Sequence, residues 1–279
     1  MTHIRIQEFR GDNPDLIDGL CLHPDDPEEM LEVMTPYMEA RKRWLRETAG
    51  KGLRLAVALG PEGQKLGLME CVPIELAAEA VRGENSLFIN CLWVLPAYWK
   101  KGVATALMNH FNLVPEGNPT GSRLPGGPGA GGVTVLCYEG DRWFGYFSYM
   151  PARFFKKFGF EEVDRDGSRV LLHLDLRGAS RPSLLRPKTR PDACSSLGRH
   201  VVEVLYNSQC PWAGWMIHGI KRYLGQFDVE LRFLNTDDRA VAEQYGMTRG
   251  VYMDGRPLIA RLAPGREVAR IVKRHLGDQ

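Results

Sequence analysis

The stretch VLPAYWKKGVATAL, residues 94–107 of this 279-residue chain, decides the fold of its first part. It predicts an apolar strand that ends, a turn through Lys100-Lys101-Gly102, and a helix that begins with small residues. Backbone N–H groups at such a turn lie at the positive end of the helix, which suits a pyrophosphate. An ordinary strand–helix turn with surface lysines could have the same sequence, so this interpretation needs support from elsewhere in the chain.

The residues after the turn are small enough for close contact with phosphate. Gly102 and Ala104 would let the main chain approach phosphate oxygens, and Thr105 would add a hydroxyl group. The residues predicted to contact the phosphates are Lys100, Lys101, Gly102, Val103, Ala104 and Thr105.

Hydrophobic patterning predicts strands and helices on both sides of this turn. The predicted strands are 3–9, 53–60, 66–74, 86–96, 133–138 and 169–176, and the predicted helices are 27–50, 97–111 and 150–160. Pro36 is expected to kink or split the first helix. The Gly/Pro-rich segment 115–132 is expected to be a flexible loop. The order predicts an α/β (α+β) domain, a mixed sheet flanked by helices, over residues 1–178.

A composition change marks a second domain. Residues 1–178 carry 20 basic and 24 acidic side chains (20 − 24 = −4), whereas residues 179–279 carry 16 and 10 (16 − 10 = +6). Residues 179–199 are rich in Pro, Ser and Arg and predict a solvated linker. Residues 200–279 predict a smaller α/β unit of the order strand, helix, strand, helix, hairpin, helix, with the hairpin turn at Asp254-Gly255.

Charge and cysteine usage exclude several classes of protein. The formal net charge of +2 gives no basic field for nucleic acid. No stretch reaches the roughly 18 consecutive apolar residues that would span a bilayer, and the N-terminus does not have the pattern of a signal peptide. The six cysteines contain no C-x-x-C pair, which favours reduced thiols in the cytoplasm over a disulfide framework or a metal site.

Two motifs together carry a family resemblance. The turn at residues 94–107 resembles the acetyl-CoA loop of the GNAT N-acetyltransferase superfamily, Q/R-x-x-G-x-G/A, with Gly102 and Ala104 at the small positions. Trp99 stands where that family usually has Gln or Arg. The segment FFKKFGFEEV, residues 154–163, resembles the aromatic-x-x-x-Gly-Phe end of the family's fourth helix. The resemblance covers residues 1–178.

The closer likeness is to a YoaP-like branch of bacterial GNAT proteins that carry a thioredoxin-like C-terminal domain. The segments LFINCLWV, GLMECVP and FFKKFGFEEVD carry it. The resemblance implies that residues 200–279 form a thioredoxin-like domain. It also implies acetyl-CoA as acyl donor, no metal, an amine acceptor that is a small molecule or a protein, and pairing into a homodimer as in many relatives.

The resemblance also implies how the acetyl group would move. A neutral amine would attack the thioester carbonyl directly, and backbone N–H groups of a bulged strand at Leu92, Trp93 and Val94 would hold the thioester oxygen. Glu70 is predicted to take the proton of the amine or to position a water, with Glu75 behind it. A solvated strand carboxylate is the alternative for Glu70.

The proton donor to the departing thiolate is less well defined. Relatives often use a tyrosine on the fourth helix, but Phe155 stands at that position here. Tyr138, Tyr146 or Tyr149 would have to replace it, unless water suffices. Cys91 and Cys137 could carry an acyl group, but small buried thiols are the favoured interpretation, and His110 is expected to be structural.

Cys210 is the notable residue of the second domain. It follows a strand and opens a helix, where the helix N-terminus would stabilise a thiolate. Ala213 stands at the resolving position and the usual cis-proline is missing, which excludes C-x-x-C redox chemistry. Three hypotheses remain: an N-acetyltransferase with an auxiliary domain, a thiol-dependent redox or sensor protein that uses Cys210, and a non-catalytic scaffold. The identity of the acceptor, and an acyl group other than acetyl, stay open.

Overall fold

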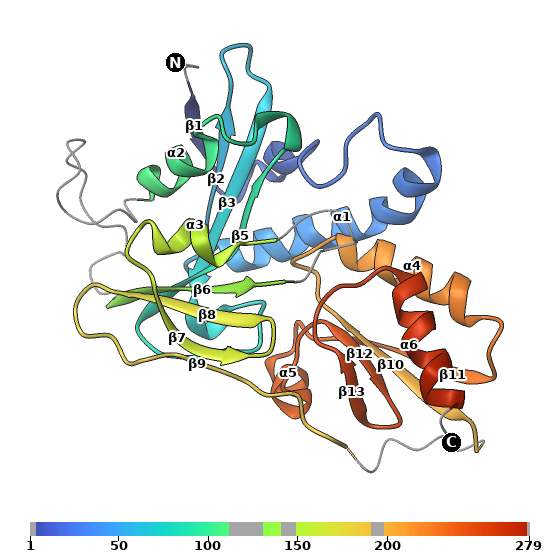
Figure 1. Cartoon of the computed structure of the whole chain (residues 1–279). Helices are drawn as coiled ribbons and strands as arrows, with labels where there is room; N and C mark the ends of the chain where they lie inside the picture. The colour runs from blue at the N-terminus through green and yellow to red at the C-terminus, as the bar shows by residue number, and fades with distance from the viewer. Residues whose placement is uncertain (1–3, 112–130, 141–148, 191–197, 278–279) are drawn as a thin grey trace.

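A seven-stranded sheet forms the N-terminal part of the chain (Figure 1) in the computed structural model, which describes residues 4–111, 131–140, 149–190 and 198–277. Its strands, in the order they lie in the sheet, are β1 (Arg5–Glu8), β2 (Arg54–Leu59), β3 (Lys65–Pro73), β5 (Ser86–Val94), β6 (Gly132–Tyr138), β8 (Arg169–Asp175) and β7 (Glu161–Asp166). The central strands are buried along nearly their whole length, as expected of strands covered on both faces.

One parallel pair interrupts this otherwise antiparallel sheet. β5 and β6 pair only from Ser86 to Ile89 and from Gly132 to Val135. Beyond these residues the two strands no longer share a ladder, although β5 continues to Val94 and β6 to Tyr138. Residues 90–94 and 136–138 therefore do not pair with each other, and we call these two segments the strand split.

Helix α1 (Glu28–Ala49) continues through Pro36, so the predicted split was wrong, while the alternative of a kink stays a prediction. Pro36 lies on the exposed side of the helix, where water can bind the carbonyl that loses its N–H partner. Met34, Met38 and Leu45 are buried on the opposite side. The spacing of these apolar residues, rather than the proline, determines the length of the helix.

Helix α2 (Val103–His110) begins later than the sequence predicts. A 3-10 turn (Pro96–Tyr98) follows β5, and regular helix begins only after Gly102. Helix α3 (Ala152–Lys156) is likewise shorter than its predicted range of 150–160. The backbone from residue 99 to residue 102 therefore forms a turn of its own, which is the part of the fold that bears on phosphate binding.

The second domain has a four-stranded sheet in the order β11 (Val229–Asn235), β10 (His200–Tyr206), β12 (Gly250–Met253) and β13 (Arg256–Ile259). β10 and β11 are parallel, and β12 is antiparallel to both of its neighbours. Its helices are α4 (Trp212–Leu224), α5 (Arg239–Tyr245) and α6 (Gly265–Gly277), and α4 packs on α6. The element order is the one predicted from the sequence.

The predicted linker is not a free tether over its described residues. Its β9 (Ser183–Leu184) pairs with β4 (Val81–Arg82), and Leu184 and Leu185 are buried. Asp164 of β7 accepts a hydrogen bond from the Leu184 N–H at 2.7 Å and forms an ion pair with Arg186 at 2.7 Å. The leucines supply the burial that the Pro/Ser/Arg composition concealed. Residues 191–197 lie outside the described residues.

The two domains share one hydrophobic core. Buried residues of the first sheet and of the second domain, including Val202, Met216 and Leu262, belong to the same cluster. Helix α1 contacts α4 (Figure 1), and Gly214 of α4 lies against the ring of Tyr37, which its absent Cβ would overlap. The domains are therefore packed together as one body.

Two sequence predictions concern the surface and the gaps. Most of the Gly/Pro-rich segment 115–132 lies outside the described residues, and only its last two residues are seen, where β6 begins. Within the described ranges, none of the helices combines the length and the apolar character needed to cross a bilayer.

Candidate functional site

The turn before α2 has the backbone of an anion-binding loop. Lys100 and Gly102 both have positive φ, +62° and +83°, and Gly102 caps α2 with no side-chain hydrogen bond. The first α2 amide that bonds back into the helix is that of Ala106, which donates to the Gly102 carbonyl. The amides of residues 103–105 therefore have no intrahelical partner, as at any helix start. Residues that alternate between positive and negative φ, as residues 100–103 do, aim such N–H groups toward a common point.

The environment of Gly102 fits a pyrophosphate. A Cβ at this position would meet nothing within 4 Å, so the positive φ, not crowding, requires glycine here. Lys101 lies over the Tyr98 ring, with Nζ 5.4 Å from the centroid, while Val103 is buried and Thr105 is exposed. All predicted phosphate contacts lie on this one turn, so the residues present suit coenzyme A.

Trp99, the departure from the family pattern, closes the turn onto β5. Its indole Nε1 donates to the Val94 carbonyl at 2.7 Å, and 46% of the residue is exposed. The side chain therefore fixes the turn to the strand that precedes it. A glutamine or arginine would instead present donors to a ligand, so the phosphate contacts here depend on backbone amides and lysines.

The bulge in β5 lies earlier than predicted. Glu70 pairs with Cys91 and Cys71 pairs with Ile89, which leaves Asn90 as the extra residue. The predicted bulge at Leu92, Trp93 and Val94 was therefore misplaced. These three residues belong to the strand split, and the Leu92 N–H, directed away from β3, donates to Sδ of Met150 at 3.2 Å. A thioether is a weak acceptor, which a stronger oxygen acceptor can replace.

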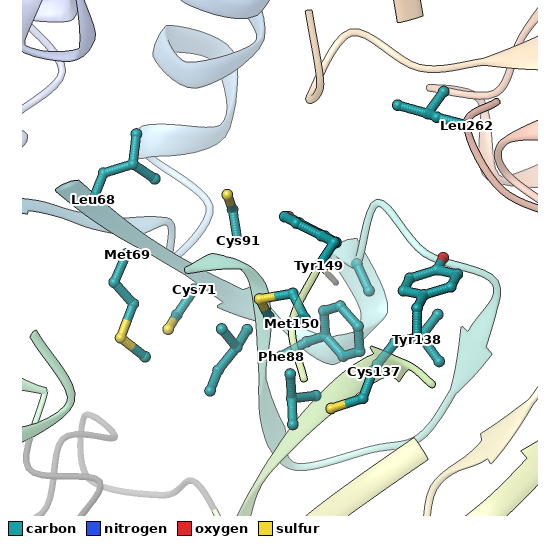
Figure 2. Packing of buried hydrophobic residues seen from close by; sticks show 14 of the residues in the cluster. Leu68, Met69, Cys71, Phe88, Cys91, Cys137, Tyr138, Tyr149, Met150 and Leu262 are labelled. Carbon is teal, nitrogen blue, oxygen red and sulfur yellow. The ribbon is translucent and has the colours of Figure 1, made fainter. Parts of the chain in front are cut away.

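Two buried tyrosines lie beside the strand split. Figure 2 shows Tyr149 between the side chains of Cys91 and Tyr138, whose ring lies 6.5 Å from that of Tyr149. The Tyr149 hydroxyl donates to the Asn90 carbonyl at 3.4 Å, and the Tyr138 hydroxyl donates to Oε2 of Glu79 at 3.3 Å. Burial raises the pKa of both phenols well above the usual value, with nearby Glu79 adding to the effect at Tyr138. Both therefore stay protonated at neutral pH. Tyr146 lies outside the described residues.

Glu70 is fully buried behind the bulge, with no exposed surface. Its Oε2 accepts from Arg41 at 2.9 Å, and its Oε1 accepts from Asn90 at 3.1 Å and from Gln209 at 3.0 Å. Both oxygens are thus occupied, so the alternative of a solvated carboxylate was wrong. Glu75, predicted to stand behind Glu70, is exposed on the turn that follows β3.

Cys210 precedes α4 as predicted, and its side chain is partly buried. Burial raises its pKa, and this outweighs the opposing effects of Arg249, Arg41 and the Trp212 amide. This direction is opposite to the stabilised thiolate that the sequence predicts, because the second domain packs its helix start against the first domain. Cys91 and Cys137 are buried, as predicted, and burial raises the pKa of each.

Two further predicted positions are structural. Phe155 is fully buried among aromatic rings, 5.2 Å from Phe154 and 5.7 Å from Phe160 between ring centroids. It cannot donate a proton. His110 bonds Glu8 through Nε2 at 2.8 Å on the surface, as a structural histidine would. No group of His, Cys, Asp and Glu within the described ranges is placed to hold a metal ion.

Several polar residues at the site were not predicted. Arg41, Glu79, Gln209 and Arg249 are all buried and join the two domains through side-chain hydrogen bonds. Arg41 and Glu79 occur in charge-rich sequence that is typical of a surface, so no local pattern reveals them. Gln209 and Arg249 also lie in sequence that gives no local signal of burial or of a partner in the first part of the chain.

Part of the chain is similar to a known protein family. Residues 21–111 match the acetyltransferase (GNAT) family. The Bacillus subtilis (strain 168) protein named uncharacterized N-acetyltransferase YoaP is 23% identical over 220 residues, covering 77% of this chain and 80% of that protein.

Solved structures show weaker likeness. The Thermoplasma acidophilum PaiA N-acetyltransferase in complex with coenzyme A is 14% identical, with a TM-score of 0.40, and covers 62% of this chain and 99% of its own. A Brucella melitensis GNAT family acetyltransferase in complex with acetyl-CoA is 20% identical, with a TM-score of 0.37, and covers 64% and 91%.

Proposed function

We propose that this chain, whose residues 21–111 match the acetyltransferase (GNAT) family, transfers an acetyl group from acetyl-CoA to an amine. The observation that carries the proposal is the turn at Lys100–Gly102. It combines two positive φ angles, an uncapped helix start and two lysines next to a strand that has left its neighbour. Such a turn binds a diphosphate through main-chain N–H groups.

Acetyl-CoA would supply an activated acyl group as a thioester. The amides of residues 103–105 and the two lysines would hold its diphosphate, and the thioester would then lie along the β5 half of the strand split. The Leu92 N–H would donate to the thioester oxygen as negative charge develops on it, with that oxygen taking the place of the Met150 sulfur as acceptor. Because this N–H is fixed in a strand, it needs little reorganisation during the reaction.

Two tyrosines are candidates to protonate the departing thiolate. Tyr138 was predicted, and Tyr149 lies beside it with its hydroxyl on the Asn90 carbonyl. Each carries its proton at neutral pH, as an ordinary phenol does, and burial raises its pKa further. Tyr149 follows the strand split in sequence and lies against β5, so we assign it the donor role ahead of Tyr138. Tyr138 is bonded to Glu79.

Glu70 is assigned a positioning role, because both of its carboxylate oxygens are bonded and the proton of the amine would pass to water. Its carboxylate reaches the strand split through Asn90, the bulged residue, and not by direct exposure. We propose that Glu70 fixes the Asn90 side chain, so that β5 presents a constant backbone to the amine. The acceptor itself is an amine of a small molecule or of a protein, and pairing of two chains stays a prediction.

We also propose that residues 200–279 are a thioredoxin-like domain. The support is the element order and a mixed sheet in which β12 runs against its neighbours. Ala213 and the raised pKa of the Cys210 thiol speak against a redox function, so the domain serves the acetyltransferase. The five described cysteines are unbridged, which supports a reducing compartment such as the cytoplasm.

Calorimetry with acetyl-CoA tests the proposal. Gly102→Asp should weaken binding by at least about 100-fold, or about 2.8 kcal/mol, because the new carboxylate would repel the diphosphate. Gly63→Asp is the matched control, since Gly63 has a φ of +80° and equally open surroundings in the turn between β2 and β3.

The control should keep full affinity. Equal losses in both variants, or none in Gly102→Asp, would remove the turn from the binding site. Mass spectrometry of wild-type reactions with a panel of amines should then show an acceptor 42 Da heavier. Absence of any acetyl-CoA binding would end the proposed function.

A further inference from the structure

A chain of buried polar side chains crosses the junction between the two domains and joins the two strands of the split. At the β5 end, Asn90 donates to Oε1 of Glu70 at 3.1 Å. The Gln209 side chain, from the second domain, donates to the same oxygen at 3.0 Å, and the Gln209 backbone carbonyl accepts from Arg41. The second domain thus contacts the residue that fixes the β5 bulge.

The middle of the chain is Arg249. Its Nη2 donates to the side-chain oxygen of Gln209 at 2.6 Å, and its Nη1 donates to Oε1 of Glu79 at 2.7 Å. Its Nε donates to Asn207 at 3.2 Å, so every nitrogen of the guanidinium has a partner. Both Arg249 and Glu79 are buried, with 2% and 4% exposure. The planar guanidinium fixes the direction of each bond.

At the β6 end, Glu79 turns to the other strand of the split. Its Oε2 accepts from the Tyr138 hydroxyl at 3.3 Å and from the Thr248 hydroxyl at 3.4 Å. The complete path, which we call the junction chain, is Asn90, Glu70, Gln209, Arg249, Glu79 and Tyr138.

The junction chain connects strands that lack a ladder between them at this level. From Asn90 onward, β5 and β6 share no backbone pairing, so side chains must fix their separation here. A buried carboxylate needs a charged or polar partner in a specific place. Glu79 finds its charged partner, Arg249, in the second domain, whereas Glu70 pairs with Arg41 of α1 and also accepts from Gln209 of the second domain. Arg249 therefore has two effects: it neutralises Glu79, and it sets the distance between Asn90 and Tyr138 at the two ends of the junction chain.

We propose that Arg249 is a positioning residue for acetyl transfer, and that the second domain holds the strand split at its working width through Gln209 and Arg249. This inference rests on the proposed function, because the split is where the thioester would lie. It assigns the second domain a role within the acetyltransferase site in place of a separate thiol chemistry.

The first test cuts the junction chain at its neutral link. Gln209→Met leaves the ion pairs Arg41–Glu70 and Arg249–Glu79 in place, so the variant should fold. We expect kcat to fall by about 10- to 100-fold, as misplacement near 1 Å does elsewhere. The KM for acetyl-CoA should stay unchanged, because the turn at Gly102 is not part of the junction chain.

The second test removes the guanidinium itself. Arg249→Ala should lose at least as much kcat as Gln209→Met, and added guanidinium ion should restore part of it by occupying the vacated space. Arg249→Lys should recover little, because one ammonium cannot donate in the fixed directions of the fork.

Arg239 supplies the matched control. It also crosses the junction from the second domain, but it donates to the backbone carbonyls of Ala77, Glu79 and Val81 and lies outside the junction chain. Arg239→Met should lower stability and leave kcat unchanged. Equal losses of kcat in this control and in Gln209→Met would reduce Arg249 to a general stabiliser and overturn the proposal.

Hydrogen exchange separates failure of this inference from failure of the proposed function. In Gln209→Met, the amides of residues 90–94 and 136–138 should exchange faster, whereas in Arg239→Met they should not. If the wild type transferred no acetyl group to any amine, the proposed function would fall and this exchange pattern would still decide the positioning role. Unchanged exchange together with unchanged kcat in Gln209→Met would refute it.

Discussion

At the scale of single residues, the sequence identifies chemistry better than it identifies environment. Gly102 could be placed because positive φ is a local requirement of the turn. Cys210 was placed correctly at a helix start, but its pKa depends on packing between domains, which no local pattern contains. Glu70 and Tyr138 were likewise found without their partners. The residue type shows which side chains can exchange a proton, whereas their burial and partners in the fold set the pKa of each.

The thiol of Cys210 provides the residue-scale prediction. Because burial raises its pKa, little thiolate forms at neutral pH, and thiolate is the reactive species. We expect iodoacetamide to label Cys210 more slowly in the folded protein than in urea-unfolded chain at pH 7.5, as measured by peptide mass spectrometry. Cys210→Ser identifies the labelled peptide. Faster labelling in the folded state would revive a thiol-dependent function.

At the scale of elements, strands and helices followed from periodicity, whereas the docking of residues 183–186 after β8, which we call the strap, did not. The segment around Leu184 and Leu185 has a linker-like composition, yet two apolar side chains and one carboxylate are enough to dock it. Composition averages over a segment and so misses a short pairing such as β4 with β9. The late start of α2 has a similar cause, since the left-handed turn at Gly102 overrides helix propensity in the residues before it.

Asp164 gives the element-scale prediction. Hydrogen bonds from Arg186 lower its pKa to about 2 in the folded protein. A carboxyl with a depressed folded pKa stabilises the protein above its unfolded pKa, about 3.9, and that contribution is lost as the pH falls from about 5 toward 2. Because Arg186 is half exposed, we expect about 1 kcal/mol, not the full value of the shift.

Urea unfolding at pH 7 and pH 3 measures this contribution. Asp164→Asn should be less stable than wild type at pH 7 and should lose less stability on acidification. Asp175, whose pKa is lowered by backbone amides of residues 177–179, serves as comparison, because Asp175→Asn should leave the strap in place. An identical pH dependence in wild type and Asp164→Asn would show that Arg186 does not hold the strap.

At the scale of the whole molecule, the sequence predicted two domains but not that they share a core. Domain boundaries leave a signal in composition, whereas docking depends on side chains far apart in the chain, such as Glu79 and Arg249. Each of these residues alone resembles a surface charge. Their pairing becomes visible only once the fold brings residues from both domains to one buried place.

Shared packing predicts that the domains unfold together. One hydrophobic cluster runs through both, and the buried ion pair Arg249–Glu79 would be exposed by separation. Pulsed hydrogen exchange across a urea series should show peptides of β3 and of β10 opening at the same midpoint. Glu79→Gln should lower both urea midpoints together, corresponding to a loss of about 3 kcal/mol in the free energy of unfolding. Opening of β10 well before β3 would mean that the domains are independent.

The contact of Gly214 with Tyr37 has a practical consequence. A Cβ there would come within 2.2 Å of the aromatic ring, although nothing in the backbone of α4 itself forbids alanine. Gly214→Ala would thus push α4 away from α1 and separate the two domains, while each domain keeps the hydrogen bonds of its own sheet. This position offers a way to uncouple the halves of the enzyme without cutting the polypeptide.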